Sequence, residues 1–284
     1  MRNEKEVLDQ LLSFARNNEM IRAVILNGSR VNPNVQKDIF CDFDVVFAVT
    51  DPKHFLNNQS WIEEFGETII VQQNKCSENS VDWFIFLMIF TDGIRIDLQF
   101  FPIEHVQMQY EDSLKVLLLD KDNAINEFEL PNESFYFTKK PSKEEFEKTI
   151  NNFWWCSTNV AKGIWRDELC YAKTMYEVVV RECIINLLSW YIGMNHNWCI
   201  NTGKWGKWFK GNLPVELWNS FVKTYSGTDY NEIWESLLEA CRLVRKIGVE
   251  VADTLGYEYP LEDDNRVYGF LQRVCSLPKD AQDI

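Results

Sequence analysis

Hydrophobic and polar residues alternate along the first hundred positions with two different periods. Residues 4–16 carry apolar side chains three or four positions apart, which predicts an amphipathic helix. A second helix is predicted over 52–64. Runs rich in branched and aromatic residues predict strands at 21–26, 43–49, 68–72, 81–90 and 94–101. This alternation is typical of a mixed sheet with helices packed against it.

The pattern changes in the second half of the chain. Between 120 and 142 the period is lost, and Pro131 and Pro141 interrupt a polar stretch, which is typical of a linker. Ser142 and Glu145 then match a capping box, so a long helix should begin at 142, and helical periods follow at 168–193, 214–225 and 229–255. The sequence therefore predicts an α+β fold, with a mixed sheet flanked by helices over 1–138 and a helical bundle domain over 139–284.

Three carboxylates lie on the predicted strands. Asp42 and Asp44 stand two apart at the head of 43–49, so the strand period places both on one face. Asp97 lies within 94–101 and joins the pair if the two strands are neighbours. Because adjacent carboxylates repel one another unless a cation lies between them, and oxygen ligands suit Mg²⁺, we interpret the three as catalytic ligands of two Mg²⁺ ions.

A Gly-Ser turn follows the first predicted strand. Gly28 lets the backbone approach a phosphate closely, and Ser29 offers a hydroxyl and a backbone N–H to phosphate oxygens. Arg30 adds a cation beside them. Either motif alone is common, but at this spacing, with a third aspartate in a later strand, they predict metal-dependent transfer of a nucleotidyl group from a triphosphate.

These motifs and their flanks resemble the aminoglycoside 6-adenylyltransferases of the nucleotidyltransferase superfamily, which inactivate streptomycin. The similar segments are 26–30, 42–45, 49–51, 61–66, 93–98, 116–122, 152–154, 160–163, 166–168 and 203–204. The resemblance implies a catalytic nucleotidyltransferase domain over 1–138 and a substrate- and nucleotide-binding domain over 139–284. It implies transfer of AMP from ATP to an aminoglycoside hydroxyl, most specifically the 6-hydroxyl of streptomycin, and hence antibiotic resistance. The family usually has Glu at the position of Asn27 and often Tyr at that of Phe43, and both departures bear on the acceptor.

The helical half supplies further candidate residues. An acidic first domain needs cations from elsewhere to hold a triphosphate, so we predict nucleotide contacts from Lys162, Lys204 and Lys207. Trp205 and Trp208 lie in a more exposed context than the other tryptophans of this half and could line a pocket for an adenine or sugar ring. Glu168 is predicted to contact the substrate or to act as the general base, a role for which Asp97 is the other candidate. For the charged residues, a solvated surface with weak ion pairs is the alternative.

Composition limits the partners. Residues 1–138 hold 11 Lys and Arg against 23 Asp and Glu, and residues 139–284 hold 18 against 20, so the first half carries most of the net charge of −14. Such acidity opposes nucleic acid as a substrate and suits a cationic small molecule. The chain shows neither a leader nor an apolar run long enough to span a membrane, so we expect a cytoplasmic protein without a membrane partner. The oligomeric state is left open.

Two alternatives from other functional classes stay open. The chain could be a nucleotidyltransferase that modifies a protein or a tRNA, which AMP transfer to a macromolecule in a lysate would reveal. It could also be a non-catalytic nucleotide-binding protein of the same fold, which ATP binding without turnover on any acceptor would indicate.

Overall fold

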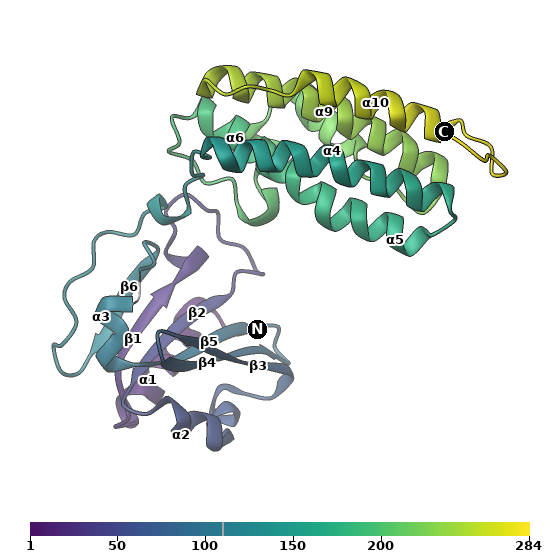
Figure 1. Ribbon diagram of the computed structural model, residues 1–284. Coiled ribbons are helices and arrows are strands. Elements are labelled where there is room, and N and C mark those ends of the chain that lie inside the picture. Colours follow the sequence, from purple (N-terminus) through teal and green to yellow (C-terminus); the bar gives the residue numbers. More distant parts are fainter. Residues whose placement is uncertain (110) are drawn as a thin grey trace. The chain divides into compact units, whose positions relative to one another are not determined.

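The computed structural model describes residues 1–109 and 111–284, which divide into two compact units, Met1–Phe135 and Tyr136–Ile284 (Figure 1). The predicted α+β fold class is confirmed, because a mixed sheet with helices is followed by an all-helical part. The first unit contains α1 (Glu4–Asn17), β1 (Ile21–Asn27), the 3₁₀ turn η1 (Gly28–Val31), β2 (Phe43–Val49), α2 (Pro52–Asn57), the 3₁₀ turn η2 (Ser60–Phe65), β3 (Thr68–Glu78), β4 (Val81–Phe90), β5 (Arg95–Pro102), α3 (Ile103–Gln109) and β6 (Lys115–Asp120). A short 3₁₀ turn, η3 (Ser134–Tyr136), lies at the junction of the units.

Six strands form one sheet in the order β3-β4-β5-β2-β1-β6. The central strands β2 and β5 are parallel, and every other neighbouring pair in this sheet is antiparallel. Since β2 and β5 run in the same direction, their first residues lie side by side. The end of β1 is paired with the start of β2, so the loop after β1 begins at the same edge.

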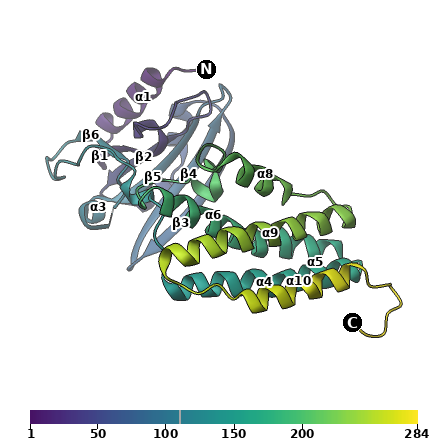
Figure 2. The ribbon, with the colours of Figure 1, turned by 90° about the horizontal axis from the view of Figure 1, so that it is seen from above.

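The two faces of the sheet bury different cores. α1, which Figure 2 shows beside the sheet, covers one face together with α2 and η2, and aromatic side chains such as Phe47 and Phe100 are fully buried there. A smaller core on the other face includes Val46, Ala48 and Phe101. Because side chains alternate along a strand, Asp44 and Asp97 belong to this second face.

Several element bounds differ from those predicted. The helix expected over 52–64 is broken into α2 and η2 at Asn58, whose extended backbone ends α2. β3 continues to Glu78 instead of ending at residue 72, because the two-residue turn Asn79-Ser80, with positive φ at both positions, lets it pair with the whole of β4. α3 and β6 were not predicted.

The second unit is entirely helical. The capping box at Ser142 and Glu145 is confirmed, and α4 begins at the next residue. The unit contains α4 (Lys143–Trp165), α5 (Leu169–Thr174), the π-helical turn η4 (Met175–Val180), α6 (Arg181–Asn195), the 3₁₀ turn η5 (Lys204–Gly206), α7 (Phe209–Asn212), α8 (Val215–Lys223), α9 (Tyr230–Leu255) and α10 (Leu261–Cys275). Over the described part of the chain, no helix is long and apolar enough to cross a membrane.

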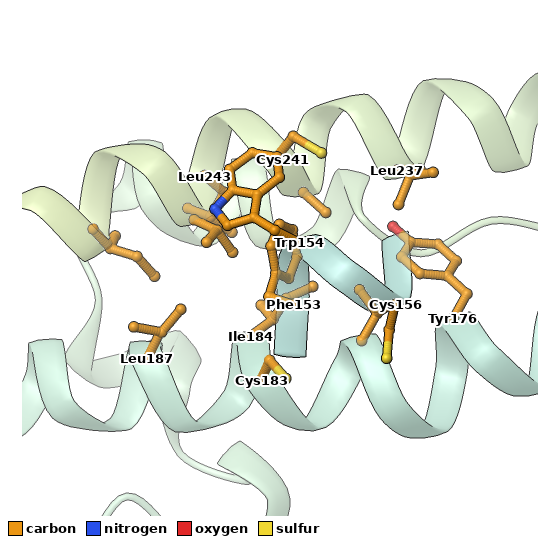
Figure 3. Close-up of a cluster of buried hydrophobic side chains, with 14 of the residues drawn as sticks. Phe153, Trp154, Cys156, Tyr176, Cys183, Ile184, Leu187, Leu237, Cys241 and Leu243 are labelled. Carbon is orange, nitrogen blue, oxygen red and sulfur yellow. The ribbon is translucent and has the colours of Figure 1, made fainter. Parts of the chain in front are cut away.

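The core of the helical unit lies between α4, α6 and α9 (Figure 3). Phe153 and Trp154 of α4 pack in it with Ile184 of α6 and Leu237 of α9, and all four side chains are buried. Full burial of each such side chain stabilises the fold by about 1.5–3 kcal/mol. This core fixes the helices that carry the candidate residues of the second half.

Candidate active site

The sheet arranges the predicted site residues in one row that crosses its strands. Asp44 of β2 is paired with Asp97 of β5 on one side and with Asn27 of β1 on the other. The row continues to Leu87 of β4 and to Lys115 of β6. Neighbouring strands are about 4.8 Å apart, and like charges directly opposite each other destabilise a sheet. The Asp44–Asp97 pair is therefore unfavourable in the free protein.

The Gly-Ser turn is in direct contact with this pair. Gly28 has a φ of +72°, and a Cβ at its position would lie 2.4 Å from Oδ2 of Asp44. Its N–H donates to the carbonyl of Leu114 at 3.0 Å, which holds the turn against the segment before β6. Only glycine has both the conformation and the space for this position. Ser29 follows, half-buried, in η1.

Burial and charge repulsion raise the pKa of Asp44. Loss of solvent is the largest cause, and the negative charges of Asp97, Asp42 and Asp112 add to it, while Arg95 acts in the opposite direction. The pKa rises from 3.8 to about 7. A carboxyl with this pKa exchanges its proton readily for a metal cation near neutral pH.

Arg95 links the other two carboxylates. Its Nε and Nη2 donate to the two oxygens of Asp97 at 2.8 and 2.6 Å, and its Nη1 lies 3.4 Å from Oδ2 of Asp42. The side chain of Asp97 is 12% exposed, whereas that of Asp42 is 30% exposed. The guanidinium therefore supplies positive charge to the carboxylate cluster in the free protein.

Arg30 has a different position from the one predicted. Its guanidinium stacks on the ring of Phe43 at 3.4 Å and donates to the carbonyls of Cys41 (2.7 Å) and Asp42 (2.9 Å). A further bond of 3.2 Å joins it to Glu4, and its side chain is only 8% exposed. These contacts hold the segment that leads into β2, so Arg30 positions Asp42 and does not extend into solvent toward a phosphate.

The chain matches the model of the streptomycin adenylyltransferase family over residues 1–274. It belongs to this family. The predicted resemblance is confirmed, and so is the prediction that the chain is a nucleotidyltransferase enzyme.

Curated relatives extend over nearly the same length. The chain is 39% identical over 268 residues to the aminoglycoside 6-adenylyltransferase of Campylobacter jejuni, with 93% of both chains covered. It is 36% identical to that of Bacillus subtilis (strain 168), covering 93% of this chain and 95% of the relative, and 32% identical to that of Staphylococcus aureus, covering 93% and 96%. The crystal structure of an aminoglycoside 6-adenyltransferase from Bacillus subtilis matches 98% of this chain and 100% of that one, with 31% identity and a TM-score of 0.49.

The carboxylate row of this family member suits Mg²⁺ in the chemistry of its donors. Carboxylate oxygens are hard ligands, and burial together with the charges of Asp97 and Asp42 disfavours the ionised form of Asp44, a cost that a bound cation would offset. The absence of a side chain at Gly28 leaves room beside Oδ2 of Asp44. Within the described residues, no three His, Cys, Asp or Glu side chains are grouped as a metal would hold them, and Arg95 pairs with Asp97 and Asp42.

The predicted lysines of the helical unit lie on different segments, Lys162 on α4 and Lys204 and Lys207 in and directly after η5. Thr138 donates its N–H to the carbonyl of Ile200 at 2.8 Å, which places the loop before Lys204 and Lys207 beside the start of α4. Lys162 is 19 residues beyond the first residue of α4, or about 28 Å along the axis at 1.5 Å per residue. The three lysines therefore come from separate segments of the helical unit, and their contact with one triphosphate stays a prediction.

Glu168 lies at the same end of α4 as Lys162. It is the exposed N-cap residue of α5, and its N–H donates to the carbonyl of Gly163 at 2.8 Å. The neighbouring Asp167, with a φ of +61°, accepts a hydrogen bond of 2.9 Å from the hydroxyl of Tyr230. These contacts account for the turn between α4 and α5, and the role of Glu168 as a base or substrate ligand stays a prediction.

Three site residues were missed in the sequence. Arg95 stands two positions before Asp97 and shares its face of the strand, so the period of two could have identified it. Asp112, which raises the pKa of Asp44, comes from the segment before β6. Lys115 ends the row, with its Nζ 4.5 Å from the ring centre of Phe128, and loss of solvent lowers its pKa. The last two could not be found, because β6 itself was not predicted.

Proposed function

We propose that the protein transfers AMP from ATP to a hydroxyl of an aminoglycoside in a Mg²⁺-dependent reaction, and that the acceptor is the 6-hydroxyl of streptomycin. Family membership supports the reaction class, and the curated relatives carry the name aminoglycoside 6-adenylyltransferase. The observation that carries the proposal is the pairing of Asp44 with Asp97 beside Gly28, because adjacent half-buried carboxylates repel each other and Arg95 pairs with Asp97 and Asp42 but not with Asp44.

Each residue of the row has a proposed role. Asp44, Asp97 and Asp42 hold the metal, and two Mg²⁺ ions are the number we propose. When bound, Mg²⁺ neutralises charge on the triphosphate and lowers the pKa of the attacking hydroxyl. Gly28 and Ser29 bind phosphate oxygens through the backbone and a hydroxyl, while Arg30 fixes Asp42 for this task.

The protein also has to orient the acceptor and remove its proton. We propose Asp97 as the base, because it lies beside Asp44 in the row, within the group that would hold the metal. Lys204 and Lys207 are the cations of the helical unit that we propose for the triphosphate. Lys162 of α4 is the third cation that we propose for it.

The reaction is tested by pyrophosphate release from ATP with streptomycin as the acceptor, in the presence and absence of Mg²⁺. We expect turnover that requires Mg²⁺ and that falls at least about 10²-fold in Asp44→Asn, the scale for the loss of a group that stabilises developing charge. NMR of the product, with a phosphorus coupling at carbon 6 of the streptidine ring, identifies the hydroxyl that is modified.

The outcomes separate reaction from acceptor. Turnover with another aminoglycoside but not with streptomycin would support adenylyl transfer and refute streptomycin as the acceptor. Labelling of a protein or tRNA in a lysate, without turnover on any aminoglycoside, would refute the proposed function. Normal turnover in Asp44→Asn would refute the assignment of the carboxylate row.

A further inference from the structure

Two adjoining cavities of the helical unit share an aromatic side chain. One has a volume of about 790 Å³ and is lined by residues of η4, α6 and η5, among them Glu182, Asn186 and Trp205. The other, of about 830 Å³, is lined by the segment after α8 and by α9, with Glu235 among its residues. Tyr225 lines both. Each cavity has the size of a small-molecule site, and together they form what we call the Tyr225 groove.

Trp205 is held in the groove at a cost to the free protein. It has a φ of +56°, in the left-handed region that a bulky side chain disfavours, and it is 78% exposed. Hydrogen bonds of 3.1 Å from the N–H of Gly206 to the carbonyl of Gly203, and from the N–H of Trp208 to the carbonyl of Thr202, fix the turn. The ring has the Nζ of Lys204 4.6 Å from its centre and is otherwise largely exposed, so contact with a ligand is the use that this geometry favours.

The ring of Tyr225, the other aromatic side chain of the groove, is held in place by Arg181. The guanidinium of Arg181 stacks on the ring of Tyr225 at 3.8 Å, and it donates to the carbonyl of Thr224 at 2.8 Å and to Glu177 at 3.1 and 3.2 Å. Arg181 belongs to the helix that follows the π-helical turn η4, a rare geometry that often occurs at functional sites. Tyr225 is thereby fixed before any ligand binds, yet it remains 52% exposed.

The groove carries excess negative charge. Arg181 is paired with Glu177, and Arg242 is paired with Glu239 at 2.7 Å, so these four charges cancel. The charged lining residues outside these pairs are Glu182, Glu232, Glu235 and one cation, Lys223. Exposed aromatic faces beside carboxylates attract cations and the apolar faces of rings, and this charge opposes a triphosphate.

We infer that the Tyr225 groove binds the cationic saccharide that accepts AMP. Trp205 and Tyr225 contact the faces of its rings, and Glu182 and Glu235 pair with its guanidinium or ammonium groups. The inference rests on the proposed function, since an aminoglycoside is such a saccharide, and it assigns the specificity for the acceptor to the helical unit.

Calorimetric titration of the full chain with streptomycin, and separately with ATP and Mg²⁺, tests this assignment. Trp205→Ala should raise the streptomycin Kd about tenfold, as loss of a cation–π and stacking contact does, and leave the Kd for ATP within twofold of wild type. Glu182→Gln should raise the streptomycin Kd several-fold, and the remaining affinity should depend less on salt. Trp155→Ala is the matched control, because Trp155 is 69% exposed on α4 and lines neither cavity.

A second variant separates binding from folding. Trp205→Gly removes the backbone strain, so it should raise the Tm of the free protein while weakening streptomycin binding as much as Trp205→Ala does. The assignment of the acceptor to the groove would be overturned if both Trp205 variants kept the wild-type affinity for streptomycin, or if they lost affinity for ATP and not for streptomycin. If wild type adenylylates streptomycin and both Trp205 variants keep its KM for streptomycin, only the assignment of the acceptor to the Tyr225 groove is refuted. If wild type transfers AMP to no aminoglycoside, the proposed function is refuted as well.

Discussion

Replacing Asp44 by Asn should make the metal-free protein more stable while lowering turnover at least about 10²-fold. The carboxyl of Asp44 has a pKa of about 7 in the folded chain, against 3.8 when fully solvated, chiefly because burial penalises its charged form. The folded state therefore holds the proton more tightly than the unfolded state does. Asparagine has a similar shape and no charge to bury, so it avoids this penalty.

The magnitude follows from the two pKa values. A tenfold change in an equilibrium constant corresponds to about 1.4 kcal/mol, so a rise from 3.8 to about 7 corresponds to about 4 kcal/mol when the group is ionised. Asp44 is half-buried, and solvent near its side chain lowers the cost, so we expect a gain of about 2–4 kcal/mol. The penalty is absent below pH ~4, grows between pH ~4 and ~7, and is complete above pH ~7.

Urea unfolding followed by circular dichroism, at pH 5 to 8 with EDTA, measures this gain. Asp44→Asn should approach wild type toward pH 5 and exceed it most at pH 8, and Mg²⁺ should reduce the difference by stabilising wild type alone. Asp92→Asn is a control of opposite sign, because a 2.8 Å ion pair with Arg2 lowers the pKa of Asp92 and makes its charge stabilising above its unfolded pKa. An Asp44→Asn protein that is less stable than wild type, or whose gain does not change with pH, would refute the reasoning.

Two further predictions concern the neighbours of Asp44. Gly28→Ala should cost about 1–2 kcal/mol of stability from its φ of +72° and should lower turnover about 10²-fold, because the new Cβ displaces Oδ2 of Asp44. Gly256→Ala, at a φ of +71° with nothing within 4 Å of the added Cβ, should show a similar stability cost with normal turnover, and equal turnover in both variants would contradict the prediction. Arg95→Gln should strengthen Mn²⁺ binding to the nucleotide-free protein several-fold in paramagnetic resonance titrations, since a competing cation is removed; weaker binding would show that Arg95 does not occupy the place of the metal.

Local periodicity was enough for most elements and for part of the site. The structure has the strands at 21–26 and 43–49, which are rich in branched residues, and the capping box at Ser142 where the sequence predicted them. Each of these features is encoded within a few neighbouring residues. The period of two placed Asp97 on a definite face of its strand. It did not specify which strand lies next to β2, because strand order depends on contacts between distant parts of the chain.

The remaining features depend on tertiary contacts or on unusual backbone geometry. Arg30 was expected at a phosphate, but the ring of Phe43 and two carbonyls that become available only in the fold bind it instead. Lys162 was grouped with Lys204 by charge alone, and the two lie on different elements, α4 and η5. A left-handed Trp205 contradicts local preference, so no propensity rule could have predicted it.

Both proposed sites contain a feature that disfavours the free fold and that ligand binding would relieve. In the first unit this feature is the pair Asp44 and Asp97, whose repulsion a cation removes. In the second it is Trp205, whose strained backbone holds an indole in solvent until a ring covers it. Selection for stability alone would favour uncharged or more flexible residues at these positions, because such strain lowers the free energy of unfolding of a marginally stable fold. That the same chain keeps one in each unit supports a division of labour, in which the sheet provides the chemistry and the helical unit selects the acceptor.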